Sequence, residues 1–422
     1  MSKQGEIVVG LDIGTTKVCA VVAEVKGGSS DFIELEVLGV GNVPCKGLRK
    51  GVVANVASTT ESIRAAIDEA ENMAGVKIQT VFAGIAGSHI RAQNSNGVVA
   101  ILANEVNQSD VDRVLENARA IPIPTDRQIL HVLAGEYLVD TQDGVREPVG
   151  MSGVRLEVKA QLITAARSCV ENVVKCAERC GLTVADIVLE PLASADAVLT
   201  EDEREIGVGV VDIGGGTTDM VLYVGGGVVS ASVIPVGGMN ITSDIAAGLR
   251  TPMAEAERLK HLRGCALGRM VPDTDEMEVP GVGGYPARRV PRRLVADIIE
   301  PRAEEIFAVV RRQLEESGFF EQLSAGIVLC GGAVLMDGMQ ELAEEVLGLP
   351  VRRGNPIGTG GLTDLTQGPQ FATAVGLARF GARALLQATV RAETISTISS
   401  KPDRQLASDN KNSFWGWLKQ AF

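Results

Sequence analysis

Two stretches far apart in the chain, one in each half, share one pattern of apolar and small polar positions. Residues 7–18 read IVVGLDIGTTKV and residues 208–221 read VGVVDIGGGTTDMV. In each stretch an apolar, β-branched run ends in an aspartate, a Gly/Thr turn follows, and a second apolar run comes next. This pattern predicts two strand–turn–strand hairpins with small residues at their tips. Its occurrence in both halves indicates a duplicated domain.

Strand-like and helical patterns alternate after each predicted hairpin. An apolar run at 33–40 precedes a helical pattern at 55–74, and a run at 228–236 precedes a helical pattern at 240–262. A third helical pattern covers 293–316. Because strands and helices alternate in both halves, we predict an α/β fold with mixed sheets.

An additional block of elements interrupts the first half at 86–165. It contains a strand-like run at 97–102, a helical pattern at 109–120 and two further strands at 128–138 and 154–163. The block is too structured for a loop and too short for a complete nucleotide-binding domain. We therefore predict an inserted α/β subdomain.

The predicted domain organisation follows from these patterns. Beyond residue 386 the chain becomes polar and Ser/Thr-rich without apolar periodicity, which is typical of a flexible linker. We expect a first domain at 1–85 and 166–205, the insert at 86–165, a second domain at 206–386 with a smaller subdomain at about 242–325, a linker at 387–411 and a terminal helix at 412–422.

Composition narrows the possible functions. The 422 residues carry a net charge of −13, so the overall field repels polyanions and argues against nucleic acid as a partner. We find neither a secretory signal nor an apolar run of ~18 residues and expect a cytoplasmic protein. Cys169, Cys176 and Cys180 share one helical face, and with three histidines and no CxxC in the chain we interpret them as core packing rather than a metal or redox cluster.

The two hairpin tips contain what a phosphate site requires. Backbone N–H groups of small residues can approach phosphate oxygens closely, and Lys17 adds a cation. Asp12 and Asp212 precede the turns and would hold a hydrated Mg²⁺, which prefers oxygen ligands and keeps its waters. One such turn alone indicates only a tight hairpin, and the P-loop and Rossmann motifs are absent. The predicted phosphate-binding residues are Gly14, Thr15, Thr16, Lys17, Gly214, Gly215, Gly216, Thr217 and Thr218.

These motifs resemble the two phosphate loops of the actin, sugar-kinase and heat-shock ATPase superfamily. Three further segments resemble its other elements in the expected order. LEPLASADAVL at 189–199 is similar to the first inter-domain helix, VLCGGAVLMDG at 328–338 to the adenosine loop, and FATAVGLARFG at 371–381 to the second connecting helix. The resemblance implies an actin-like (ribonuclease H-like) duplicated two-domain fold that binds ATP.

The resemblance also implies individual roles. Gly331 and Gly332 would approach the adenosine, and Glu257 and Lys260 would flank its ribose and base. Glu190 would orient the attacking water, although a carboxylate at a helix start also suits the helix dipole. Phosphoryl transfer needs positioning and charge neutralisation more than covalent chemistry. We expect at most a weak ATPase in which the nucleotide acts mainly as an assembly switch.

Within the superfamily the chain most resembles the FtsA family, bacterial cell-division actin homologues, over essentially its whole length. EPVGMSGVRLEVKAQLITA at 147–165 and RRLVADIIEPRAEEIF at 292–307 carry the likeness. It implies a protein that polymerises at the inner face of the cytoplasmic membrane at the division site, tethers FtsZ filaments there and recruits downstream division proteins. The FtsZ C-terminal peptide would bind near Arg293 and Arg302, where a solvated helix start is the alternative interpretation.

The last twelve residues, KNSFWGWLKQAF, form an amphipathic helical pattern that contains both tryptophans of the chain. Such a stripe either packs on the protein's own core or lies at a membrane interface. The polar stretch before it favours the membrane, with lysine toward anionic lipid. One tail would bind weakly, whereas many tails on a polymer would bind tightly. The predicted membrane-contacting residues are Phe414, Trp415, Trp417, Leu418, Lys419 and Phe422.

Two other functions remain open from the sequence. A small-molecule kinase of the same fold would need a sugar site and a catalytic aspartate in its first domain, for which we find no candidate. A cytoplasmic adaptor of type IV pili, similar to PilM, would share the fold and the inserted block but should lack the aromatic tail.

Overall fold

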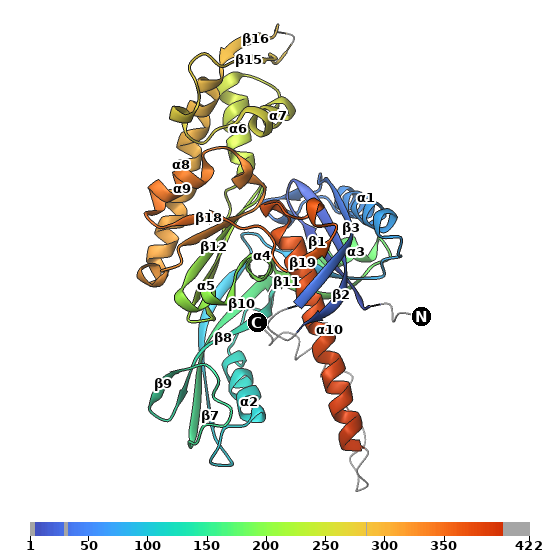
Figure 1. The fold of residues 1–422 in the computed structure, drawn as a ribbon, viewed down its shortest axis with the longest axis vertical. Helices are drawn as coiled ribbons and strands as arrows, with labels where there is room; N and C mark the ends of the chain where they lie inside the picture. Colours follow the sequence, from blue (N-terminus) through green and yellow to red (C-terminus); the bar gives the residue numbers. More distant parts are fainter. Residues whose placement is uncertain (1–4, 29–32, 284, 400–422) are drawn as a thin grey trace.

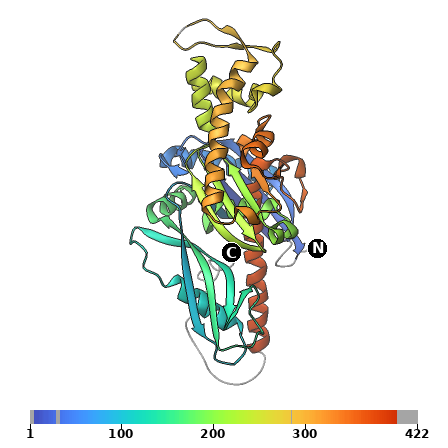
Figure 2. The same cartoon turned by 90° about the vertical axis from the view of Figure 1, so that its left-hand side faces the viewer.

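The computed structural model describes residues 5–28, 33–283 and 285–399. Two α/β halves lie side by side in the middle of an elongated molecule (Figure 1). A small α/β subdomain extends from the first half at one end, and a mostly helical subdomain extends from the second half at the other (Figures 1 and 2).

The first half is built on a six-stranded mixed sheet. In spatial order its strands are β11 (Thr183–Leu189), β6 (Thr80–Ile85), β1 (Ile7–Ile13), β2 (Lys17–Gly28), β3 (Ile33–Pro44) and β19 (Thr359–Gly361). β1 and β2 form the first predicted hairpin, β3 pairs antiparallel with β2, and β6 runs parallel to both β1 and β11. Helices α1 (Val56–Ala74) and α3 (Arg167–Glu178) pack on this sheet.

The second half repeats this topology. Its five strands are β14 (Gly227–Ile234), β13 (Thr218–Val224), β12 (Val208–Ile213), β17 (Ile327–Cys330) and β18 (Val351–Arg353). β12 and β13 form the second predicted hairpin, β14 pairs antiparallel with β13, and β17 runs parallel to both β12 and β18. The shared strand order confirms the predicted duplication.

The inserted subdomain has a sheet and a core of its own. The sheet runs β7 (Arg91–Ala100), β10 (Arg155–Ala166), β8 (Arg127–Val139), β9 (Gln142–Val145), and α2 (Gln108–Arg119) packs on it. A capping box between Asn107 and Asp110 starts α2 at Gln108, one residue before the predicted Ser109. Val114, Leu156 and Leu162 are fully buried in this separate core.

The smaller subdomain of the second half corrects one predicted helix. Residues 240–262 form two helices, α6 (Gly238–Leu249) and α7 (Met253–Arg263), rather than one. Arg250 is left-handed at φ 48° and Pro252 precedes α7. Proline lacks an N–H and disfavours helical geometry in the residue before it, so the chain breaks there. The subdomain also contains α8 (Arg292–Glu316), which confirms the third helical pattern, and the hairpin of β15 (Glu276–Val279) and β16 (Arg288–Pro291).

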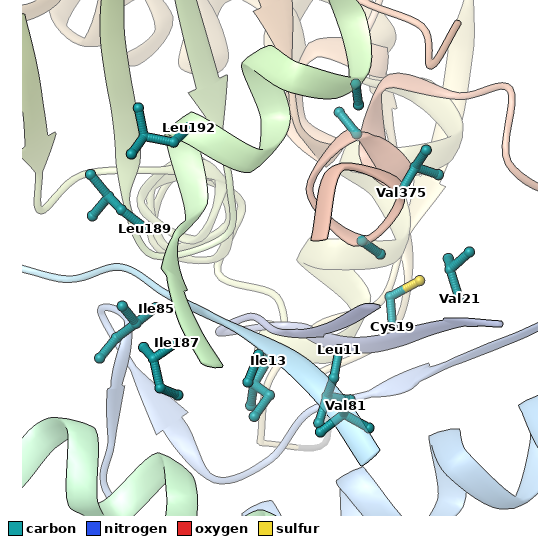
Figure 3. Close-up of a cluster of buried hydrophobic side chains, with 14 of the residues drawn as sticks. Leu11, Ile13, Cys19, Val21, Val81, Ile85, Ile187, Leu189, Leu192 and Val375 are labelled. Atoms are coloured by element: carbon teal, nitrogen blue, oxygen red, sulfur yellow. The ribbon is translucent and has the colours of Figure 1, made fainter. Parts of the chain in front are cut away.

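Two connections join the halves. The first is α4 (Glu190–Val198) followed by α5 (Glu201–Ile206), and the second is α10 (Ala372–Ser399). Figure 3 shows Leu192 of α4 and Val375 of α10 in the same buried cluster as Leu11 of β1 and Val81 of β6. The remaining strands and α-helices of the described residues are the hairpin of β4 (Leu48–Arg49) and β5 (Val52–Val53), and α9 (Met339–Leu347).

Helix α10 corrects the predicted linker. We expected a flexible segment at 387–411, but α10 continues to Ser399. The stretch 387–399 contains no glycine or proline, and adding residues to an existing helix is easier than nucleating one. The remainder of the linker and the predicted helix at 412–422 lie outside the described residues. In the ranges that the structure describes, no helix has the length and apolarity needed to cross a bilayer.

Candidate functional site

A cavity of about 970 Å³ opens between the two hairpin tips and receives residues from both halves. This volume falls in the range of cofactor and ligand sites. The structure brings fifteen of the sequence-predicted residues into its lining: Asp12, Gly14, Thr15, Thr16, Lys17, Glu190, Asp212, Gly214, Gly215, Gly216, Thr217, Glu257, Lys260, Gly331 and Gly332.

Thr218 is the exception among the predicted phosphate-binding residues. Its side chain is fully buried, and its hydroxyl donates to the Val236 carbonyl at 2.8 Å. Successive side chains of a strand point to opposite faces, and Thr218 is the first residue of β13. In this structure the Thr218 side chain therefore holds β13 to the segment after β14 and does not line the cavity.

The two hairpin tips have the same turn and meet across the cavity. The Gly14 amide donates to the Lys17 carbonyl at 2.9 Å, and the Gly214 amide donates to the Thr217 carbonyl at the same distance. A methyl group on Gly216 would lie 2.6 Å from the Thr15 hydroxyl oxygen, so the tips approach too closely for a larger residue.

The backbone of both tips is available to a ligand. Within the described part of the chain, the amides of Thr15, Thr16, Gly215 and Gly216 donate to no acceptor. Gly216 is buried, Thr15 and Gly215 are half-buried, and Thr16 is exposed. Buried backbone N–H groups are normally paired. Four unpaired donors at facing tips form a cradle suited to phosphate oxygens.

The floor of the cavity is acidic. Asp12, Asp212 and Asp219 are buried, and Glu190 lies half-buried beside them at the start of α4. Burial raises the pKa of Glu190 well above its ordinary value, and repulsion from Asp12 and the two other aspartates adds to the shift. Burial likewise raises the pKa values of the three aspartates. Lys17 partly compensates, with its Nζ 3.4 Å from Asp12 Oδ2.

This donor set fits a hydrated divalent cation. A positive ion would relieve the repulsion among the carboxylates, and Asp219 Oδ1 is buried without a hydrogen-bond partner. Among the residues with described positions, no three ligating side chains converge closely enough to hold a metal directly. Contact through water, which Mg²⁺ tolerates readily, is compatible with this arrangement.

Three residues of the site were missed by sequence reasoning. Ser194 of α4 donates to Asp212 Oδ2 at 2.7 Å, and Thr373 of α10 donates to the same oxygen at 3.2 Å. Asp219 accepts from the Thr217 hydroxyl at 3.0 Å. Asp219 follows the second glycine turn directly and was visible in the motif, whereas Ser194 and Thr373 gave no local signal because both reach Asp212 only in the folded protein.

Helices α6 and α7 contribute a second polar group to the cavity. Lys260 Nζ donates to the Gly238 carbonyl at 3.1 Å, the Thr242 hydroxyl at 2.9 Å and Glu257 Oε2 at 2.8 Å. These three bonds use every donor of the ammonium group. Burial alone would raise the pKa of Glu257, but the charge and hydrogen bond of Lys260 outweigh it and lower that pKa. Lys260 therefore positions Glu257, whose carboxylate accepts from His261 Nε2 at 2.9 Å.

The predicted partner-binding arginines lie outside this cavity, on α8. Arg302 binds Asp244 of α6 through two hydrogen bonds of 2.6 and 3.2 Å, which holds the two helices together. Arg293 contacts Asp297 at 3.2 Å and is partly exposed. Phe414, Trp415, Trp417, Leu418, Lys419 and Phe422 lie outside the described residues.

Two of the three cysteines that were predicted to share a helical face pack in the core as the sequence indicated. Cys176 is fully buried in the core of the first half, and Cys180 packs against that core with its thiol 3.3 Å from the Thr60 carbonyl. Cys169 is half-buried near the start of the helix.

Comparison with solved structures identifies the fold. The protein of the PilM–PilN type IV pilus biogenesis complex matches with a TM-score of 0.63 at 21% identity, covering 89% of this chain and 98% of that chain. MreB5 of Spiroplasma citri bound to ADP matches with a TM-score of 0.52 at 15% identity, covering 92% and 98%. At these identities the likeness shows the actin-like fold alone.

Sequence comparison identifies the family. The model described as "Cell division protein FtsA" matches residues 209–376, and "SHS2 domain inserted in FTSA" matches residues 87–164. The chain is 50% identical to the cell division protein FtsA of Pseudomonas aeruginosa, over 90% of each chain. It is 42% identical to that of Escherichia coli, over 93% of this chain and 94% of the relative. The chain belongs to the FtsA family of cell division proteins.

Proposed function

We propose that this chain binds Mg²⁺-ATP in the cavity between its halves and uses the nucleotide as a switch for assembly. The observation that carries the proposal is the pair of facing tips with unpaired amides above an acidic floor. A solved MreB5 structure of the same fold holds ADP, which supports a nucleotide as the ligand.

The residues of the cavity suit distinct parts of this ligand. The tip amides and Lys17 would bind phosphate oxygens, and Asp12 and Asp212 would hold Mg²⁺ through its waters, supplying charge neutralisation. Glu190 would orient a water. Burial and the neighbouring aspartates raise its pKa, and a bound Mg²⁺ would oppose this shift. We expect at most slow hydrolysis, because the site offers positioning and charge neutralisation rather than covalent chemistry.

Calorimetry of the full chain tests this assignment. We expect Mg²⁺-ATP and Mg²⁺-ADP to bind with one site per chain, and Lys17→Ala to weaken ATP about 10- to 100-fold because a charge-assisted contact to phosphate is lost. Lys26→Ala is the matched control, since Lys26 lies on the same strand and pairs with Glu24 and Glu36 away from the cavity. Wild-type protein that ignores both nucleotides would contradict the proposal.

We further propose that the chain polymerises on the inner face of the cytoplasmic membrane at the division site. In this proposal the terminal helix 412–422 binds anionic lipid, the FtsZ C-terminal peptide docks near Arg293 and Arg302, and downstream division proteins are recruited. Membership of the FtsA family supports these roles. Helix α10 also projects beyond the first half (Figure 1), so the chain leaves Ser399 away from the cavity.

Vesicle sedimentation tests the membrane role. We expect the full chain with ATP to sediment with anionic vesicles and less with neutral ones, because the lysine of the terminal helix would face anionic lipid. One short amphipathic helix binds weakly, so assembly of many chains should strengthen the binding through avidity. A chain ending at Ser399 should stay in the supernatant. If the shortened chain sediments as well as the full chain, the terminal helix is not the membrane anchor.

A further inference from the structure

Three lysines line the cavity, and they differ in how their charges are used. Lys17 lies 3.4 Å from Asp12 and donates to the Gln370 carbonyl, and Lys260 donates to three acceptors of the protein. Lys46 is exposed and, in the ranges described, makes no ion pair or hydrogen bond. Its charge is therefore available to a ligand.

The segment that carries Lys46 is anchored on both sides. The Cys45 amide donates to the Thr16 carbonyl at 2.9 Å, and the Gly51 amide donates to the Thr15 hydroxyl at 3.1 Å. Both bonds end on the first hairpin tip. Lys46 thus sits on a short segment whose two ends are fixed to a phosphate-binding turn.

The residues that lead into helix α1 also hold the segment in place. The Gly47 carbonyl accepts from the Ala54 and Asn55 amides at 2.8 and 2.9 Å. A methyl group on Gly47 would lie 2.7 Å from the Asn55 carbonyl oxygen, so the backbone there is in close contact with the start of the helix. These contacts restrict the position of Lys46 at the edge of the cavity.

The same segment reaches the second tip. Lys50 adopts a left-handed conformation with φ 50°, which costs energy for a residue with a side chain. Its Cα lies 3.0 Å from the position that a methyl group on Gly216 would occupy. Residues 45–51 therefore contact both tips, and a movement of either tip would displace this segment.

Its position places Lys46 at the phosphate end of the cavity. The residues on the nucleoside side, Glu257, Gly331 and Gly332, all belong to the second half, whereas Lys46 comes from the first half beside Thr16. With the nucleotide site proposed above as its basis, we propose that Lys46 binds the terminal phosphate of a nucleoside triphosphate and lets the site distinguish triphosphate from diphosphate.

Calorimetry with the full chain, Mg²⁺ and either the non-hydrolysable triphosphate AMPPNP or ADP tests this inference. Lys46→Gln is expected to weaken AMPPNP binding about tenfold, which corresponds to about 1.4 kcal/mol, and to change ADP binding less than about twofold. Lys46→Arg should retain the preference because it keeps the cation. Arg49→Gln is the control, since Arg49 is exposed on the same segment but does not line the cavity.

The outcomes separate this inference from the nucleotide proposal. Suppose that the wild-type chain binds both nucleotides. If Lys46→Gln then weakens AMPPNP and ADP binding equally, or weakens the binding of neither, the role of Lys46 is refuted and the nucleotide site stands. If Arg49→Gln weakens AMPPNP binding as much as Lys46→Gln does, the loss reflects general electrostatics, and the role of Lys46 is also refuted. Wild-type protein that binds neither nucleotide would overturn both. Thermal unfolding of each variant verifies that its fold is intact.

Discussion

Replacing Asp196 with alanine is expected to lower the free energy of unfolding by about 3–5 kcal/mol, the cost of removing one partner from a buried ion cluster. Asp196 is 3% exposed. Its carboxylate binds Arg383 at 2.9 Å and Arg204 at 3.3 Å, and its carbonyl accepts from Arg379 at 2.5 Å. Without this carboxylate three buried or half-buried guanidinium groups would repel one another.

The cluster joins both connections between the halves. Asp196 lies on α4, Arg204 on α5, and Arg379 and Arg383 on α10. Because these connections join the two halves that line the cavity, we expect the variant also to bind nucleotide less tightly. If the nucleotide affinity falls by more than the fraction of unfolded protein accounts for, the variant affects binding separately from its effect on stability.

The stabilisation by Asp196 should depend on pH in a defined direction. Burial alone would raise its pKa, but the charges of Arg383, Arg204 and Arg379 outweigh burial and lower it. A carboxyl whose pKa is lowered in the folded state contributes stability above its ordinary pKa of about 4 and loses it as the pH falls through the folded value. The difference between wild type and variant should therefore shrink below about pH 4.

Urea unfolding followed by circular dichroism measures this difference. Asp196→Asn keeps the shape of the side chain and removes its charge, so it should lose most of the same stability. Asp202→Ala, on the exposed surface of α5, should stay within about 0.5 kcal/mol of wild type. A loss below about 1 kcal/mol for Asp196→Ala would mean that the arginines find other partners, and the cluster would not be a principal link.

Local patterns predicted the fold well where the folded contacts are also local. Both hairpins and the inserted block were recognisable because strand alternation and turn residues lie within a dozen positions of one another. The break at Pro252 was also encoded locally, but the helical spacing of the apolar residues on both sides obscured it. For α10, polar composition suggested a linker, although the stretch to Ser399 contains no residue that ends a helix.

The supporting residues of the site could not be predicted in the same way. Ser194 and Thr373 hold Asp212 from two different helices, and the Ser194–Thr373 contact of 3.0 Å joins residues 179 positions apart. The Asp196 cluster likewise joins residues from different helices, α4, α5 and α10. Resemblance identified Lys260 as a site residue, but only the folded geometry shows that its donors are already used by Glu257 and the start of α6.

Gly331 and Gly332, which we propose to lie beside adenosine, are expected to serve different purposes. Gly331 has φ 91°, and a methyl group there would lie 2.5 Å from Asp212 Oδ1 and close to the Ile213 carbonyl. Gly331→Ala should therefore lower the free energy of unfolding by about 2–4 kcal/mol, through backbone strain and displacement of the end of β12. Gly332 meets no atom within 4 Å at the corresponding position. Gly332→Ala should leave stability within about 0.5 kcal/mol of wild type.

For nucleotide binding we expect the larger effect from the change at Gly332, whereas for stability we expect it from the change at Gly331. The methyl group of Gly332→Ala would enter the space of the cavity that we assign to adenosine, and overpacking there should weaken Mg²⁺-ADP about tenfold while the fold remains intact. Urea unfolding and calorimetry on both variants measure the two effects. If Gly332→Ala binds ADP as wild type does, the adenosine lies elsewhere in the cavity. If Gly331→Ala is as stable as wild type, the approach of this loop to Asp212 does not constrain the fold.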